Sequence, residues 1–204
     1  HATGTWRLLS GVPVTPALTA DPKGIFRQDN HMWLYATSNG RVLQMGPSKN
    51  MNWIDTNGSG TITPAGPRAD SADAMNGNAI AYDINKILTL GGATAYDHAN
   101  ATNRAYTIDV TSGQPVVTRT GDMGFARAFA NSVVLPNGQV VVIGGQTYPA
   151  PFSDTTSVMT PELWDPHSGA FTSLATMPVP RNYHSVANLL PDGRVFSGGG
   201  GLCG

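Results

Sequence analysis

The sequence predicts an all-β protein with the architecture of a β-propeller, and three observations support this fold class. The 204 residues include 24 glycines and 15 prolines, which separate short apolar segments instead of forming low-complexity tracts. Such punctuation is typical of many short strands joined by tight turns. A hairpin-like pattern also recurs along the chain at a nearly constant spacing, and long stretches of helical periodicity are hard to find.

The repeated unit consists of an apolar strand, a polar turn, a second apolar strand and a pair of glycines. Three copies span residues 78–92, 131–145 and 184–199. The turns Pro136-Asn137-Gly138 and Pro191-Asp192-Gly193 are strong hairpin signals, whereas the turn at 83–86 is weaker. The glycine pairs begin at positions 91, 144 and 198, so they lie 53 and 54 residues apart. We expect these glycines where a strand bends close to a neighbouring unit and a side chain would clash.

Further strand-like segments lie between the copies. Residues 104–110 and 162–165 each combine an aromatic with an acidic residue and lead into a Ser-Gly turn, and 170–174 follows the second. A fainter copy of the repeat covers 31–46. Four strands in about fifty residues with a double glycine form the pattern of a kelch blade. We therefore expect about four kelch-type blades, with residues 1–204 all in one propeller domain.

Four blades are fewer than a closed kelch propeller generally has, so we expect part of a seven-bladed propeller. The chain also stops at Leu202-Cys203-Gly204, directly after a glycine run. The missing segments of the same propeller would then be the nearest partners of this chain.

Composition argues against two classes of partner. Charged residues make up 12% of the chain and the formal net charge is −1, so no basic field would attract nucleic-acid phosphates. No apolar run approaches the roughly 18 residues of a membrane-spanning helix, so no membrane partner is expected. Two N-glycosylation sequons, Asn57-Gly58-Ser59 and Asn100-Ala101-Thr102, lie in polar turn-like segments and favour a secreted protein.

Longer motifs connect these repeats to a known family. Residues 180–204 (PRNYHSVANLLPDGRVFSGGGGLCG) and 29–53 closely resemble segments of the kelch-type copper radical oxidases, the galactose oxidase family. Residues 73–83 and 125–138 are similar to further segments, in the family's order. The resemblance implies a secreted enzyme that uses O2 to oxidise a primary alcohol to an aldehyde, or an aldehyde to an acid, and releases H2O2. Galactose-type sugars, other primary alcohols and glyoxal-like aldehydes all remain open as substrates.

The Tyr-His-Ser motif carries the sharpest functional assignment. In the family its tyrosine and histidine bind copper, which implies Tyr183 and His184 as metal ligands. Imidazole nitrogen and phenolate oxygen both suit copper. Adjacent residues of a regular strand point to opposite faces, so both can reach one metal only at a strand entrance or loop, near the propeller axis. The resemblance also makes Tyr183 the base that takes the substrate's hydroxyl proton. A structural surface pair is the alternative interpretation.

The resemblance implies further residues on the substrate side. Phe26 and Arg27 match the family's aromatic–arginine pair, whose arginine hydrogen-bonds sugar hydroxyls. Phe152 matches an aromatic residue that lines the sugar pocket. Tyr96 and Asp97 stand where galactose-selective members have Tyr-Gln, so Asp97 replaces a neutral group by an anionic acceptor and puts selectivity for galactose in doubt. A surface arginine and a turn-packing phenylalanine are the alternative interpretations of Arg27 and Phe152.

Several parts of the family's site have no match in this sequence. The radical cofactor is a tyrosine thioether-linked to a cysteine beneath a stacked tryptophan, and a second histidine completes the copper site. In the family the first three precede this region, and the histidine follows it in a C-terminal β-domain. Cys203 instead resembles one half of a short-loop disulfide. The resemblance therefore implies copper and a Cys–Tyr radical cofactor for a longer parent, and the 204 residues alone are expected to be inactive.

Other features favour simpler interpretations or a different function. Residues 55–60 resemble the start of a calcium loop, but Gly66 stands where the twelfth-position acid is required, so a turn between strands is expected. His98 lies in a polar turn and is expected to be exposed to solvent. A non-catalytic propeller that binds a glycan or a protein through its loops also remains open. It is favoured by Asp97, by Ala130 where the family tends to place a histidine, and by the unmatched radical residues.

Overall fold

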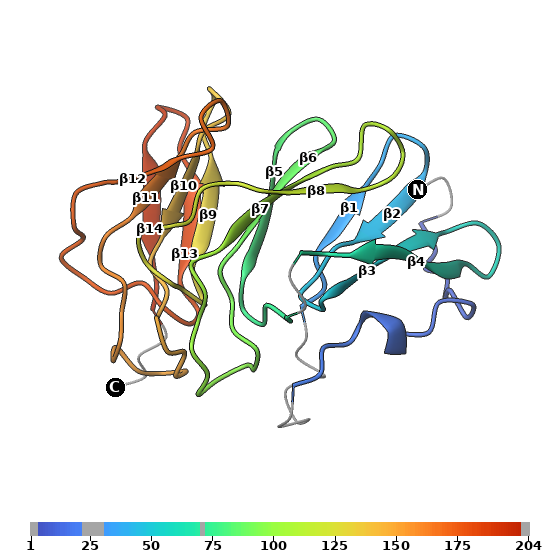
Figure 1. The fold of residues 1–204 in the computed structure, drawn as a ribbon, viewed down its shortest axis with the longest axis horizontal. Coiled ribbons are helices and arrows are strands. Elements are labelled where there is room, and N and C mark those ends of the chain that lie inside the picture. The colour runs from blue at the N-terminus through green and yellow to red at the C-terminus, as the bar shows by residue number, and fades with distance from the viewer. Residues whose placement is uncertain (1–3, 22–30, 70–71, 201–204) are drawn as a thin grey trace.

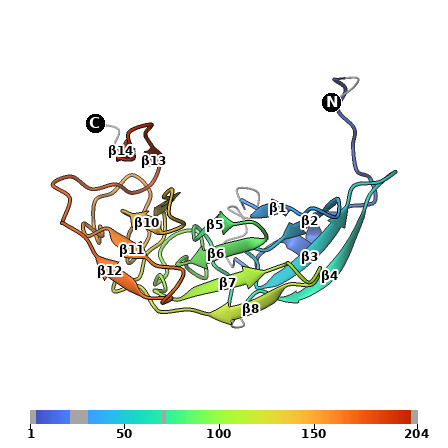
Figure 2. The same ribbon diagram turned by 90° about the horizontal axis from the view of Figure 1, so that it is seen from above.

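In the computed structural model, which describes residues 4–21, 31–69 and 72–200, the chain forms four antiparallel sheets and one short 3-10 helix, η1 (Thr15–Ala17). The sheets follow one another in chain order and fan out side by side as the blades of a β-propeller (Figures 1 and 2). The predicted all-β propeller architecture is therefore confirmed. No helix in these described ranges has the length and apolarity needed to cross a membrane.

Three blades have four strands and the last has two, and neighbouring strands in each sheet are consecutive in the sequence. Blade 1 contains β1 (Leu34–Ala36), β2 (Arg41–Gln44), β3 (Asn50–Asp55) and β4 (Thr61–Pro67). Blade 2 contains β5 (Asn78–Asp83), β6 (Lys86–Leu90), β7 (Ala105–Asp109) and β8 (Val116–Arg119). Blade 3 contains β9 (Asn131–Val134), β10 (Val140–Ile143), β11 (Glu162–Trp164) and β12 (Phe171–Ser173). Blade 4 contains β13 (Val186–Leu189) and β14 (Val195–Gly198).

The repeated hairpins of the sequence are the first two strands of each blade. In the second copy Asn131 pairs with Ile143, and in the third Val186 pairs with Gly198. The segment at 55–60 is a turn between β3 and β4, as expected from the missing acidic ligand. Turn chemistry and alternation were therefore sufficient to locate the hairpins, because each turn sets the register of the strands beside it.

The first strands of successive blades lie beside one another. β5 contacts β9, and β9 contacts β13. Asn78, at the start of β5, donates a side-chain hydrogen bond of 3.0 Å to the carbonyl oxygen of Ala130. The equivalent Asn131 of β9 donates one of 2.8 Å to the Ser185 hydroxyl. An asparagine side chain thus joins blade 2 to blade 3 and blade 3 to blade 4, in each case at the residue that precedes the first strand of the next blade.

The hydrophobic core lies between the blades. Alternation along β6 sends Ile87 toward the cluster shared with blade 1, and Leu88 and Leu90 toward the cluster shared with blade 3. Trp53 of blade 1 and Trp164 of blade 3 are buried on either side. Because β10 is covered on both faces, its Val-Val-Val-Ile run is continuously apolar and buried.

The glycine pairs that begin at 91 and 144 lie where neighbouring blades meet, as predicted, whereas Gly198 and Gly199 lie against Phe196 and His184 of their own blade. A Cβ atom on Gly91 would approach the carbonyl oxygen of Arg127 to 2.3 Å, and one on Gly144 would approach that of Arg181 to 1.8 Å. Both glycines also have φ in the left-handed region, at +62° and +69°. The absent side chains let Gly145 donate a 2.8 Å hydrogen bond from its N–H to Arg181 of the next blade.

A buried ion pair braces the start of blade 3. The guanidinium of Arg127 contacts the Glu162 carboxylate, and both side chains are almost fully buried. Arg127 also donates to the carbonyl oxygen of Gly144 at 2.9 Å and to that of Thr160 at 3.1 Å. Burial lowers the pKa of Arg127, and the charge of Glu162 partly opposes this shift. The pair therefore ties β11 to the glycine pair that supports blade 4.

Residues 15–21, which include η1 and are called the strap below, run from blade 1 to blade 2. Pro16 accepts a 3.3 Å hydrogen bond from the Asn52 side chain of β3. The Asp73 carboxylate accepts from the N–H of Ala20 at 2.7 Å and from that of Lys49 at 2.8 Å. These contacts hold the strap and place its last described residue, Asp21, beside the loop that carries Tyr96.

Candidate functional site

Tyr183 and His184 lie at the entrance to β13. His184 is two residues before the first residue of its strand, and Asn76 and Phe129 hold the same position before β5 and β9. All three have left-handed backbones, with φ of +56°, +60° and +63° in chain order. This conformation is uncommon for residues other than glycine, so it marks a repeated structural feature of the blades.

The turn brings the two adjacent rings together. The Tyr183 and His184 rings are stacked, with centroids 3.7 Å apart and an interplanar angle of 26°. In a regular strand their side chains would point to opposite faces. The left-handed residue at the strand entrance therefore allows both side chains to present their polar atoms together.

Hydrogen bonds hold the loop that carries this pair. The side-chain amide of Asn182, which is buried, donates to the Ser157 hydroxyl at 2.8 Å and to the carbonyl oxygen of Ser153 at 3.3 Å. Arg181 donates to the carbonyl oxygen of Gly199 at 3.1 Å. The residues before Tyr183 are thus anchored both to blade 3 and to the end of blade 4. Sequence reasoning did not single out Asn182, whose type alone carries no metal or catalytic signal.

Tyr96 contacts the pair from blade 2. Its phenol hydroxyl donates a 3.2 Å hydrogen bond to the Tyr183 hydroxyl, and its ring is buried. The N–H of Tyr96 donates to the Asp21 carboxylate at 3.1 Å. The strap therefore supports Tyr96, which in turn contacts Tyr183 from two blades away.

Aromatic rings surround Tyr183. Phe129 and Phe152 each lie 5.0 Å from it between centroids, with interplanar angles of 60° and 85°. Phe152 also meets His184 edge-on at 5.6 Å and is half exposed. Such edge-to-face contacts are the favoured geometry of aromatic pairs and hold ring orientation. Sequence reasoning assigned no role to Phe129, although its place in the repeat matches that of His184 and could have indicated this contact.

Asp97 follows Tyr96, is buried and pairs with the neighbouring His98. Its carboxylate lies 2.9 Å from Nδ1 of His98, whose ring meets Tyr148 edge-on at 6.1 Å. His98 is expected to be exposed from its sequence context, and its side chain is indeed 57% exposed while it contacts Asp97. Asp97 is therefore part of a polar pair beside the Tyr96–Tyr183 contact.

Some sequence-predicted residues lie outside the described part of the chain. Phe26, Arg27 and Cys203 are among them. Of the predicted site residues that are described, Tyr183, His184, Phe152 and Tyr96 come together in one cluster, and Asp97 adjoins it. Among the described residues, no three His, Cys, Asp or Glu side chains are grouped so that they could hold a metal ion.

The cluster fits half of a metal site on the chemistry of its donors. Tyr183 offers a phenol oxygen and His184 an imidazole, and neither ring nitrogen of His184 is hydrogen-bonded to a described residue. Oxygen and imidazole nitrogen donors side by side suit a transition metal such as copper.

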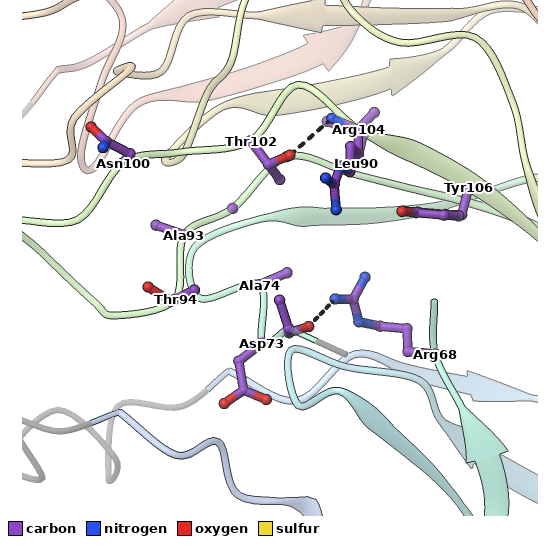
Figure 3. Close-up of a pocket in the computed structure, with 13 residues that line it drawn as sticks. Arg68, Asp73, Ala74, Leu90, Ala93, Thr94, Asn100, Thr102, Arg104 and Tyr106 are labelled. Atoms are coloured by element: carbon purple, nitrogen blue, oxygen red, sulfur yellow. Dashed lines mark hydrogen bonds between the residues drawn. The ribbon is translucent and has the colours of Figure 1, made fainter. Parts of the chain in front are cut away.

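A separate small cavity lies between blades 1 and 2 (Figure 3). Arg68, Arg104 and Tyr106 line it, and Arg68 donates to the carbonyl oxygen of Ala72 at 2.8 Å. Burial lowers the pKa of Arg68, while Tyr106 and Asp73 oppose this shift. None of the sequence-predicted site residues that the structure describes lines this cavity.

Comparisons with known proteins agree with this fold. The family model described as Glyoxal oxidase N-terminus matches residues 75–202. A galactose oxidase of Gibberella zeae is 46% identical over 98% of this chain, which covers 31% of that protein. An aldehyde oxidase, GLOX, of Vitis pseudoreticulata is 41% identical over 45% of this chain and 18% of that protein.

A solved structure is also similar to this chain, in both fold and sequence. It is described as a novel fungal alcohol oxidase with catalytic diversity among the AA5 family, in complex with copper, and it matches with a TM-score of 0.93 and 44% identity. The match covers 100% of this chain and 42% of that one, so the chain spans less than half the length of these relatives. The resemblance found in the sequence is thus confirmed: this chain belongs to the glyoxal oxidase N-terminus family and, with galactose oxidase, to the kelch-type copper radical oxidases.

Proposed function

We propose that this chain is part of a copper radical oxidase that oxidises a primary alcohol to an aldehyde, or an aldehyde to an acid, with reduction of O2 to H2O2. The stacked pair of Tyr183 and His184 at the entrance to β13 carries the proposal. The pair offers a phenol oxygen and an imidazole nitrogen as adjacent donors. The relatives of the chain, which include a galactose oxidase and a copper-bound alcohol oxidase, also support the proposal.

In this proposal the two residues have different tasks. His184 holds the copper ion through an imidazole nitrogen, and Tyr183 binds it through the phenol oxygen. Tyr183 also takes the hydroxyl proton of the substrate as a general base. Tyr96, which hydrogen-bonds to the Tyr183 hydroxyl, orients the phenol for this transfer. When bound, copper and a Cys–Tyr radical cofactor supply the one-electron chemistry of the oxidation.

The substrate would lie against the exposed side of the cluster. Phe152 is half exposed beside both proposed ligands and would contact the carbon skeleton of the substrate. Asp97, with Tyr96, would face its hydroxyl groups, and Phe26 and Arg27 are proposed to do so from outside the described residues. An anionic acceptor favours a substrate that offers hydroxyl donors and disfavours a carboxylate.

The proposal also concerns the rest of the protein. The chain would form part of one propeller domain, and flanking blades with a C-terminal β-domain would bring the second copper histidine and the radical cofactor. Residues 1–204 alone would then lack activity. The resemblance to the copper radical oxidases also implies that the parent protein is secreted.

Copper loading and peroxide release of the full-length protein test this function. We expect His184→Ala to lose the electron paramagnetic resonance signal of bound copper. Tyr183→Phe should reduce peroxide production by about 10²–10⁴-fold because a general base is lost. His167→Ala, in an exposed turn of blade 3, is the matched control and should change neither. Unchanged copper signal and peroxide release in Tyr183→Phe would contradict the proposal.

A non-catalytic propeller that binds a glycan or a protein is the second candidate. The Asp97–His98 pair favours it. Ala130, where the family tends to place a histidine, favours it too, since its backbone carbonyl oxygen accepts a hydrogen bond from Asn78 and it offers no imidazole. Glycan-array binding by the copper-loaded full-length protein, without peroxide release on any bound sugar, would favour this function over oxidation.

A further inference from the structure

The two N-glycosylation sequons are not explained by the proposed chemistry, and both lie on the surface. Asn57 is exposed in the turn between β3 and β4, at the edge of blade 1. Asn100 is exposed in the loop between β6 and β7 of blade 2. An N-linked glycan is bulky and hydrophilic, so an acceptor asparagine must face solvent in the folded protein.

The turn at Asn57 has room for a glycan. The Asp55 carboxylate accepts 2.8 Å hydrogen bonds from both the backbone N–H and the side-chain amide of Asn57. A Cβ atom placed on the neighbouring Gly58 would meet no atom within 4 Å, and the Arg7 guanidinium contacts the turn at the backbone carbonyl oxygens of Thr56 and Gly58. An amide nitrogen that carries a sugar keeps one N–H, so the contact with Asp55 can persist after modification.

The loop at Asn100 combines a fixed backbone with an accessible side chain. The N–H of Ala101 donates to the carbonyl oxygen of Thr147 and that of Thr102 to Gly92, both at 2.9 Å. Asn100 is one of the residues that line the cavity between blades 1 and 2, and in Figure 3 its amide lies at the edge of this group, far from Arg68 and Tyr106. A glycan at this position would therefore extend into solvent without displacing either blade.

We propose that Asn57 and Asn100 are N-glycosylation sites of this protein. In the reaction the side-chain nitrogen forms a bond to the anomeric carbon of a lipid-pyrophosphate-linked oligosaccharide. The bond from that carbon to phosphate breaks, the lipid pyrophosphate leaves, and the nitrogen loses one proton. The inference rests on the secretion that forms part of the proposed function.

Two other asparagines of the chain are exposed but do not belong to a sequon, so they serve as controls for the effect of exposure alone. Asn39-Gly40-Arg41 and Asn137-Gly138-Gln139 form the turns of the β1–β2 and β9–β10 hairpins, and both asparagines are exposed. They share the Asn-Gly turn with Asn57 but lack the hydroxyl residue at the third position. We expect both to remain unmodified.

Peptide mapping of the full-length protein secreted from a fungal host tests the proposal. Peptide N-glycosidase in heavy-oxygen water should leave labelled aspartate at positions 57 and 100, and none at 39 or 137. Asn57→Gln and Ser59→Ala should each abolish the label at 57, and Asn100→Gln and Thr102→Ala that at 100. Gln139→Ser, which completes a sequon in an existing exposed turn, should add a glycan at Asn137.

The outcome is separable from that of the oxidase proposal. An unlabelled peptide at either position in the secreted protein overturns the proposal for that asparagine. Peroxide release measured on the same sample is independent of it, since neither residue lies in the Tyr183–His184 cluster. An active protein without glycans contradicts only the glycosylation, and a glycosylated protein without copper or activity contradicts only the oxidase.

Discussion

The hydroxyl of Tyr96 lies 3.2 Å from the hydroxyl of Tyr183, although 87 residues separate them in the chain. Tyr96 belongs to blade 2 and Tyr183 to the start of blade 4, and Phe129 of blade 3 contacts both rings. The contact therefore exists only because the β6–β7 loop of blade 2 and the entrance loops of blades 3 and 4 meet in the same region.

Tyr96→Phe should weaken catalysis without removing the metal. The change deletes one hydrogen bond to Tyr183 while keeping the ring, and such a bond contributes about 0.5–1.5 kcal/mol, or roughly 2- to 13-fold in rate. We expect a fall of this size in kcat and a shifted pH profile, with copper content unchanged. Steady-state kinetics of the full-length, copper-loaded protein would measure both.

Tyr82→Phe provides the control for that measurement. Tyr82 packs edge-on against Trp164 between blades 2 and 3, away from the cluster. Its kinetic constants and pH profile should match those of the unmodified protein. Equal effects of the two substitutions would indicate that Tyr96 acts only through stability.

Asp97→Gln should alter substrate preference more than turnover. The change replaces an anionic acceptor, paired with His98, by a neutral donor–acceptor. Exchange of one hydrogen bond, about 1 kcal/mol, predicts a roughly fivefold change in KM for hydroxyl-rich sugars. KM for a short alkyl alcohol should change less, and kcat for both should stay similar. Parallel changes for both substrates would exclude Asp97 from the substrate pocket.

Glu162→Ala should destabilise the protein strongly. Removal of one partner leaves Arg127 charged and buried, which costs about 3–5 kcal/mol. The melting temperature of the full-length protein should fall clearly. Asp122→Ala, which breaks the exposed pair with Arg119, should change the melting temperature little. The double variant Arg127→Met, Glu162→Leu should recover most of the loss, and a double variant no more stable than Glu162→Ala would contradict this explanation.

Gly144→Ala should disturb the loop that carries Tyr183 and His184. The new Cβ atom would lie 1.8 Å from the carbonyl oxygen of Arg181, two residues before Tyr183. We expect lower thermal stability together with weaker copper binding. Gly193→Ala is the matched control, since its φ of +84° is also left-handed but no atom lies within 4 Å. It should show only the backbone penalty of about 1–2 kcal/mol, with copper binding unchanged. Equal copper affinity in both variants would argue against support of the loop by the glycine pair.

Local patterns in the sequence were sufficient to predict the blades. The turn at Pro136-Asn137-Gly138 and the glycine pair at 144 locate β9 and β10, because turn residues and steric exclusion act over a few positions. The YHS segment likewise identified Tyr183 and His184 as the candidate ligands by resemblance. These features depend on neighbours in the chain, and a repeat shows them several times over.

Contacts between blades were not available from such patterns. The contact of Phe129 with Tyr183 and the anchoring by Asn182 of the loop that carries Tyr183 were not predicted. The pairing of Asp97 with His98, which are adjacent in the chain, was not predicted either. Of these, only the repeat position of Phe129 gave a signal, since it matches that of His184.

The sequence by itself determined the propeller class, the hairpins and the pair of candidate ligands. Only the tertiary structure decided that the rings of the two candidate ligands stack, and that Tyr96, Phe129 and Phe152 from two other blades surround Tyr183. The physical reason is that strand and turn formation follow local backbone and side-chain preferences. The site instead depends on how blades pack, which is set by core side chains and glycines far apart in the chain.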